Sequence, residues 1–233
     1  MPVSPTLVLV HGAWHDTWCW EKLIDALPDI ETRAVSLPSS GHDPSALGDL
    51  RADADALRSV LASVDGPVVV CAHSYGGLPA TEVAGETGDV RRLVYLCAFQ
   101  LDVGESLLGA AGGTGPEWWD VHEAQGHIEV LRPQEVFYGD LDADTAAAAA
   151  ARLGYQSLRS VTQPLTAAAW RTVPSTYVVA ERDAAIPVPV QEAMAHRAQV
   201  VRRLDTSHSP FLARPAVLAD LLREELAKAE AEG

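Results

Sequence analysis

The sequence has few cysteines and no long apolar run, and both absences narrow the range of functions. Cys19, Cys71 and Cys97 are an odd number at wide spacing, which excludes a disulfide scaffold and a CxxC metal or redox site. No apolar run approaches the roughly 20 residues that cross a bilayer, and the N-terminus carries no basic segment of a secretory signal. We therefore expect a cytoplasmic protein with no membrane partner.

Positive charge is also scarce, since 17 Lys and Arg stand against 32 Asp and Glu, for a formal net charge of -15. Such a surface repels phosphate backbones, so nucleic acid is not an expected partner. The chain has no HExxH motif, no phosphate-binding loop and no GxGxxG motif with a following acidic residue. We therefore expect no metal and no cofactor. The patterns do not specify an oligomeric state, and a homodimer is left open.

What the chain does have is a series of short apolar runs rich in β-branched residues. Such runs without polar alternation are typical of strands buried on both faces, as in a parallel sheet covered by helices. Stretches with apolar residues at spacings of three and four lie between them and favour helices. The predicted strands are 6–10, 32–35, 67–72, 93–97, 176–180 and 200–204, and the predicted helices are 18–27, 47–63, 78–84 and 215–229. This order predicts an α/β fold with a mostly parallel sheet flanked by helices.

One long segment, 99–171, interrupts this alternation and shows no clear strand. It is far longer than a normal connection between two strands. The segment contains a glycine-rich stretch at 109–116 and an alanine run at 146–151, which is a strong helix former. The sequence therefore predicts an inserted, mainly helical cap or lid at 99–171 over an α/β core made of 1–98 and 172–233.

Ser74 follows the strongest predicted strand and precedes a predicted helix, in the order Ala72-His73-Ser74-Tyr75-Gly76. A serine on such a tight turn between two small residues is presented at the carboxyl edge of the sheet, next to the N–H groups of the following helix. This context favours a nucleophile. The alternative is an ordinary turn in which Ser74 caps the helix.

The segment His11-Gly12-Ala13-Trp14 ends the first predicted strand. A His-Gly pair at this point is a common source of the second oxyanion donor, because glycine lets the backbone approach the site. We therefore expect the N–H groups of Ala13 and Tyr75 to form an oxyanion hole. A simple strand-ending turn is the alternative.

A serine nucleophile needs a base that a third group orients. Asp183 and His208 follow the last two predicted strands, at the sheet edge where ligand sites lie, and they give the chain order serine, acid, histidine. The predicted catalytic residues are therefore Ser74, Asp183 and His208. Glu181 and Asp102 are alternatives for the acid.

These motifs together resemble the α/β-hydrolase superfamily over nearly the whole chain, and more narrowly the branch of plant methyl esterases, hydroxynitrile lyases and bacterial esterase relatives. The segments that carry the resemblance are 11–14, 72–77, 137–138, Asp183 with 186–187, and 208–211. The resemblance implies a Ser-His-Asp site that cleaves a small carboxylic ester beneath a small cap.

The lyases of that branch resemble one another in a threonine before the hole-forming residue and a lysine after the catalytic histidine. Here Gly12 and Ser209 occupy these places, so no fixed cation is available for a leaving cyanide, which favours an esterase. A carbon–carbon lyase or cofactor-free oxygenase on the same scaffold, and a binding protein without chemistry, are the alternatives.

Aromatic residues near the motifs and in the predicted cap favour an apolar substrate pocket. Core packing is the alternative role for each of them. The candidate substrate-binding residues are Trp14, His15, Trp118, Trp119, Phe137 and Tyr138.

Overall fold

The computed structural model describes residues 4–231 and is built on a six-stranded sheet in the order β10-β9-β5-β4-β1-β2. Every neighbouring pair in this sheet is parallel. The strands are β1 (Thr6–Val10), β2 (Thr32–Val35), β4 (Pro67–His73), β5 (Asp89–Leu96), β9 (Ser175–Ala180) and β10 (Val200–Leu204). All six lie where the apolar runs predict them.

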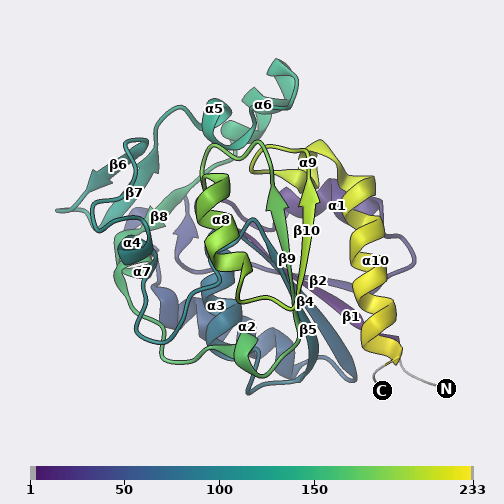
Figure 1. Cartoon of the computed structure of the whole chain (residues 1–233). Coiled ribbons are helices and arrows are strands. Elements are labelled where there is room, and N and C mark those ends of the chain that lie inside the picture. The colour runs from purple at the N-terminus through teal and green to yellow at the C-terminus, as the bar shows by residue number, and fades with distance from the viewer. Residues whose placement is uncertain (1–3, 232–233) are drawn as a thin grey trace.

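Helices cover both faces of this sheet (Figure 1). The α-helices are α1 (Glu21–Asp25), α2 (Leu50–Ala62), α3 (Gly77–Val83), α4 (Leu107–Ala110), α5 (Pro133–Phe137), α6 (Ala143–Ala150), α7 (Leu158–Thr162), α8 (Val188–Ala195), α9 (Pro210–Ala213) and α10 (Pro215–Ala231). The 3-10 helices are η1 (Thr17–Trp20), η2 (Pro44–Ala46), η3 (Ser74–Gly76) and η4 (Ala169–Arg171). The predicted α/β class is confirmed.

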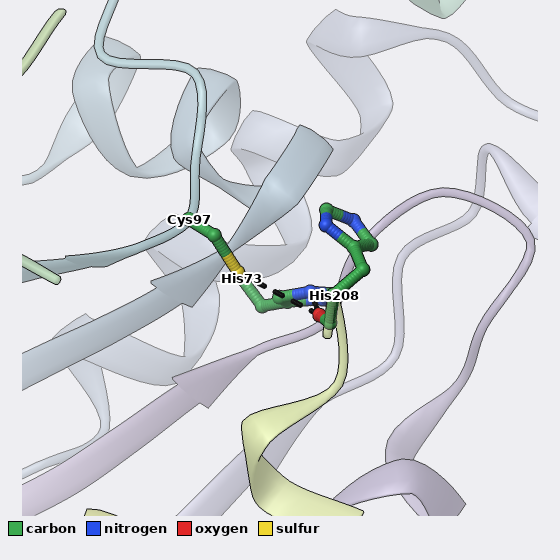
Figure 2. Close-up of side chains that lie close together, drawn as sticks. All are labelled: His73, Cys97 and His208. Carbon is green, nitrogen blue, oxygen red and sulfur yellow. Dashed lines mark hydrogen bonds between the residues drawn. The ribbon is translucent and has the colours of Figure 1, made fainter. Parts of the chain in front are cut away.

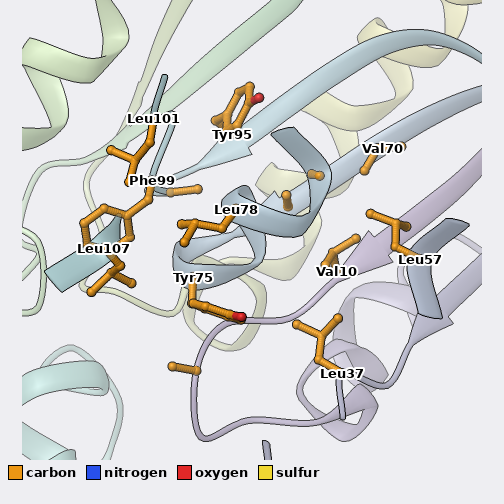
Figure 3. Close-up of a cluster of buried hydrophobic side chains, with 14 of the residues drawn as sticks. Val10, Leu37, Leu57, Val70, Tyr75, Leu78, Tyr95, Phe99, Leu101 and Leu107 are labelled. Atoms are coloured by element: carbon orange, nitrogen blue, oxygen red, sulfur yellow. The ribbon is translucent and has the colours of Figure 1, made fainter. Parts of the chain in front are cut away.

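Successive side chains of each central strand enter two different hydrophobic clusters, which explains why the strands are apolar throughout. Val8 and Val10 pack with α2 and α3 on one face, whereas Leu7 and Leu9 pack with α1 and α10 on the other. Figure 3 shows part of the first cluster, in which Val10 lies beside Leu57, and Leu78 lies beside Phe99. Because both faces of the sheet are buried, only strands that are apolar on both sides can lie at its centre.

The inserted segment differs from its prediction, because it contains strands as well as helices. β6 (Trp119–His122), β7 (His127–Val130) and β8 (Tyr155–Ser157) pair with β3 (Ser40–Gly41) in an antiparallel sheet of the order β3-β8-β7-β6. These strands have at most four residues and mix polar with apolar side chains, so no apolar run marks them. The expectation of no strand in this segment is wrong. The boundaries 99–171 themselves stay a prediction.

The insert lies beyond the arrowheads of β9 and β10, so it covers the carboxyl edge of the parallel sheet (Figure 1). Among the described residues, no helix combines the length and the apolar character that crossing a membrane requires. Cys19, Cys71 and Cys97 are buried free thiols. Burial raises the pKa of the Cys71 thiol to about 12, as is usual for a cysteine that serves as a small core residue.

Candidate active site

Ser74 stands on the turn between β4 and α3 with a φ of +52°, a left-handed conformation that a non-glycine residue rarely adopts. The turn requires a glycine two residues later. A Cβ on Gly76 would lie 2.5 Å from the carbonyl oxygen of His11 and 2.7 Å from that of Val10. The close approach of β1 and this turn therefore excludes any side chain at position 76.

A continuous hydrogen-bonded chain joins Ser74, His208 and Asp183. Ser74 Oγ lies 2.9 Å from Nε2 of His208, and Nδ1 of His208 lies 2.7 Å from Oδ2 of Asp183. Because a carboxylate accepts, Nδ1 carries the proton and the lone pair of Nε2 faces the serine hydroxyl. The structure thus brings together three residues that are up to 134 positions apart in the chain.

The loop after β9 holds Asp183 through its other oxygen. Oδ1 accepts the N–H groups of Ala185 at 2.7 Å and of Ile186 at 2.9 Å. Gln191, on α8, donates from Nε2 to Asp183 Oδ2 at 3.1 Å and to the Ile186 carbonyl at 2.7 Å. Gln191 is fully buried and was not singled out from the sequence, where it is an ordinary helical glutamine. Its amide fixes the carboxylate in one orientation.

The other candidate acids do not contact His208. The Asp102 carboxylate accepts a hydrogen bond from Arg171 at 2.6 Å, and Glu181 pairs with Arg203 at 3.7 Å. Each of these carboxylates therefore lies beside an arginine, which Glu181 shares with Glu192.

The back of His208 is fixed by two buried side chains, His73 and Cys97 (Figure 2). His73 donates from Nε2 to the His208 carbonyl at 2.8 Å, and Cys97 donates from Sγ to the same oxygen at 3.6 Å. The ligand atoms of these three residues are close enough to one another to hold a metal ion, but both ring nitrogens of His208 are used by Asp183 and Ser74. The group therefore positions the histidine backbone. Burial lowers the pKa of His73, which keeps its ring neutral.

A residue of the insert, Asp140, also holds the histidine loop. Its carboxylate accepts the N–H of Ser207 at 2.8 Å and the hydroxyl of the same residue. Arg182 lies 3.7 Å from Asp140 on the outer side. Asp140 was not singled out from the sequence, because its partner is 67 positions away. The insert is thus tied to the residue that precedes His208.

The backbone N–H groups of Ala13 and Tyr75 belong to residues that line the same cavity as Ser74. Within residues 4–231, neither N–H donates to a protein acceptor. The next N–H, of Trp14, donates to Oε1 of Gln156 on β8 at 3.1 Å. The Tyr75 hydroxyl donates to Oδ2 of Asp53 at 2.5 Å. Buried polar partners therefore hold both backbone segments in place and leave two donors free.

Asp53 is itself fully buried and also accepts the N–H of Ser39 at 2.8 Å. Burial raises the pKa of the Asp53 carboxyl to about 6, against the opposing effect of the hydrogen bonds from Ser39 and Tyr75. An ionised carboxylate is costly in a site without a cation. The carboxyl group that holds the Tyr75 hydroxyl, that of Asp53, therefore has a pKa of about 6.

Two histidines of the first loop have structural roles. His11 donates from Nδ1 to the Gly12 carbonyl and accepts the Leu37 N–H at Nε2, at 2.8 and 3.0 Å. His15 donates from Nδ1 to the Ala13 carbonyl at 2.8 Å and accepts the Tyr138 hydroxyl at Nε2, also at 2.8 Å. Because burial lowers the pKa of His15 to about 3, its ring is neutral and this tautomer is fixed. His15 thus fixes the orientation of the Ala13 carbonyl group.

A cavity of about 270 Å³ opens above Ser74. Trp14, His15, Trp118, Trp119 and Phe137 all line it, together with Phe99, Leu107, Val161 and Ile186. Tyr138 is not part of the lining, because its ring is buried behind His15. Among the described residues that line this cavity, none is Asp, Glu, Lys or Arg. The walls of this cavity are therefore mainly apolar and carry no carboxylate or basic side chain.

Comparison with known proteins gives matches over the whole described fold. The family model described as "Alpha/beta hydrolase family" matches residues 7–221. The chain is 30% identical to the alpha/beta hydrolase nvfD of Aspergillus novofumigatus, over 97% of this chain and 98% of that protein. It is 26% identical to Methylesterase 2 of Arabidopsis thaliana, over 92% and 93% of the two chains. A pyrethroid hydrolase from Sphingobium faniae JZ-2 has the same fold, with a TM-score of 0.83 at 21% identity over 99% of this chain and 100% of that one.

Proposed function

The chain belongs to the α/β hydrolase family, and from this membership and the geometry at Ser74 we propose that it is a serine hydrolase that cleaves small carboxylic esters. The resemblance to a branch that includes plant methylesterases is confirmed by the relatives. The observation that carries the proposal is the hydrogen-bonded chain from Ser74 through His208 to Asp183 at the floor of an apolar cavity. Two free backbone N–H groups beside the serine support it.

In the acylation step, Nε2 of His208 takes the proton of Ser74 as Oγ attacks the ester carbonyl carbon. The carbonyl oxygen gains negative charge and is stabilised by the N–H groups of Ala13 and Tyr75. The carboxylate of Asp183 stabilises the imidazolium that forms. The tetrahedral intermediate then collapses, and His208 returns the proton to the alcohol that leaves.

In the deacylation step, His208 takes a proton from water, which attacks the acyl-serine. The second oxyanion uses the same two N–H groups. Collapse releases the carboxylic acid and returns the proton to Ser74 Oγ. His208 thus acts as base and then acid in both halves of the reaction.

The cavity supports a neutral substrate of limited size. Its volume of about 270 Å³ is below the usual range for drug-sized ligands, which begins at about 300 Å³. Trp118, Trp119 and Phe137 supply edge and face contacts for an apolar acyl or alcohol group. Assays with p-nitrophenyl esters of increasing acyl length would find the largest acyl group that fits the cavity. Beyond that length, kcat/KM should fall sharply.

The surroundings of His208 favour ester cleavage over cyanohydrin cleavage. A leaving cyanide needs a nearby cation, and the cavity lining includes no lysine or arginine among the described residues. Ser209, which follows His208, is buried and neutral. If a cyanohydrin were turned over faster than the best ester in the panel, the protein would have to be reassigned as a lyase.

The direct test is the Ser74→Ala variant with a p-nitrophenyl ester and a fluorophosphonate label. We expect turnover to fall at least 10³-fold and labelling to disappear, because the nucleophile is removed. Ser59→Ala is the matched control, since Ser59 lies on the exposed face of α2 and only back-bonds to Asp55. Wild-type rates in Ser74→Ala, or a label on another residue, would refute the assignment.

A further inference from the structure

The insert carries a second cluster of chemically active side chains, on the hairpin formed by β6 and β7. The register pairs Asp120 with Glu129 and His122 with His127. Because side chains alternate along a strand and paired residues share a face, all four side chains lie on one face of the hairpin. Two imidazoles and two carboxylates thus converge within one hairpin turn.

The distances within this cluster are close to those of ligands around one ion. Nε2 of His122 lies 3.4 Å from Oε1 of Glu129 and 3.5 Å from Oδ2 of Asp120, and Nε2 of His127 lies 3.8 Å from Oε1 of Glu129. Ligands of a tetrahedral zinc ion at about 2.1 Å are about 3.4 Å apart. The ligand atoms of His122, His127 and Glu129 all lie within 4.8 Å of one another, and Asp120 adds a fourth group beside His122. To bind one ion, the half-exposed Glu129 and Asp120 must move inward, and the two imidazole rings, which are stacked at 4.7 Å, must turn toward it.

Unsatisfied nitrogens add a second, independent observation. Nε2 of His122 and Nδ1 of His127 are buried atoms that make no hydrogen bond within the described chain. The His127 side chain is only 7% exposed, and the ring of Tyr155 packs against it edge-on at 4.7 Å. A buried nitrogen without a partner is unfavourable, and a cation held next to Glu129 would satisfy Nε2 of His122.

The donor set selects the kind of ion. Calcium and magnesium prefer an all-oxygen shell, whereas imidazole with carboxylate suits zinc and its first-row neighbours. The cluster does not touch the catalytic cavity, whose lining includes neither histidine. We propose that Asp120, His122, His127 and Glu129 form a divalent transition-metal site, with zinc as its ion, that cross-links the two strands of the hairpin.

The bound ion would stiffen a segment that contacts the site wall. Ile128, between His127 and Glu129, accepts a hydrogen bond from the indole N–H of Trp14 at 2.8 Å. The metal site is thus one residue away from a support of the cavity. The proposal does not depend on ester hydrolysis, because it stands on the hairpin alone.

The test uses the full chain without a polyhistidine tag, treated with chelator and then equilibrated with zinc chloride. We expect elemental analysis after gel filtration to find one zinc per chain. At a zinc concentration about 100-fold above Kd, Tm should rise by about 5 °C. Cobalt in place of zinc should give the visible absorption of a tetrahedral nitrogen and oxygen site.

The variants His122→Ala and Glu129→Gln should each weaken zinc binding at least tenfold, whereas the exposed His196→Ala on another element should bind like wild type. Both replaced side chains are at least one-third exposed, so circular dichroism should show an intact fold in each. Failure to retain zinc would overturn the proposal, and so would equal binding by these variants and the wild type. Loss of binding in His196→Ala would do the same.

Discussion

Gln156 Oε1 accepts the backbone N–H of Trp14 at 3.1 Å, so a side chain of the insert holds the loop that carries the Ala13 donor. The other end of the amide donates to Ser39 at 2.9 Å and to Ser160 at 2.7 Å. Gln156 is fully buried. The proposed oxyanion hole would therefore depend on a residue 142 positions away from the loop that it supports.

The Gln156→Leu variant should lower kcat about 10- to 100-fold with a smaller change in KM, because the freed loop no longer aims the Ala13 N–H at the oxyanion. The loss of several buried hydrogen bonds should also cost about 1–3 kcal/mol of stability. Steady-state kinetics and urea unfolding measure the two effects.

Gln163→Leu is the matched control for this variant. Gln163 also connects the insert to α2, through the Leu50 N–H at 2.9 Å and the Asp49 carboxylate at 3.0 Å, but it is not part of the cavity lining. We expect it to lose stability and keep its kcat. Equal losses of kcat in both variants would show that Gln156 contributes only to stability.

The Asp183→Asn variant should lower kcat about 10⁴-fold, because an amide can donate to Nδ1 of His208 and so favour the wrong tautomer. Asp102→Asn should leave kcat unchanged, since Asp102 contacts Arg171 and not His208. If the Asp102 variant lost activity and the Asp183 variant kept it, the acid would have to be reassigned. Kinetics with one p-nitrophenyl ester measures both.

Asp53 should make stability depend on pH in a defined window. Burial raises its pKa in the folded protein to about 6, from the 3.8 of an ordinary aspartate, so the folded state holds the proton more tightly than the unfolded chain. The contribution of Asp53 is therefore most favourable below pH 4 and is lost as pH rises through 6, by on the order of 3 kcal/mol.

The Asp53→Asn variant cannot ionise and should lack this dependence. The difference in unfolding free energy between variant and wild type should therefore increase in favour of the variant from pH 4.5 to pH 7.5. Urea unfolding at both pH values measures this difference. The substitution also changes the hydrogen bonds of residue 53, but that contribution is the same at both pH values and cancels when the two differences are compared. A difference that does not change with pH would show that Asp53 is ionised throughout.

The Gly76→Ala variant should be destabilised by several kcal/mol and lose activity, because the new Cβ would meet the His11 carbonyl oxygen at 2.5 Å. Gly139→Ala is the control, since its Cβ would meet only the Glu135 carbonyl at 3.5 Å. Thermal melts compare the two. A Gly76 variant as stable as the Gly139 variant would show that β1 can move away from the turn.

The sequence predicts the central strands and the residues at their carboxyl ends because burial on both faces leaves a strong local pattern. Thr6–Val10 and Thr32–Val35 have the predicted bounds, and Ser74, Asp183 and His208 meet as their chain order predicts. Whether they act as catalytic residues stays a prediction.

The residues that support the site leave no such pattern. Gln156, Gln191 and Asp140 are polar residues in short or unremarkable segments, and their partners are distant in the chain or visible only after folding. Helix α8 was not predicted because it has prolines at its start and little amphipathic character. The strands of the insert are too short for alternation to be recognised.

The contacts of Asp140 and Gln156 have a consequence for how molecules enter and leave. One anchors the loop before His208 and the other anchors the loop after Ala13, and both come from the insert. If the insert moved outward as a rigid body, it would pull both loops away from Ser74 and, under the proposed function, stop turnover. We therefore expect substrate and products to enter and leave through small movements of the side chains that line the cavity, while the insert keeps its contacts with both loops.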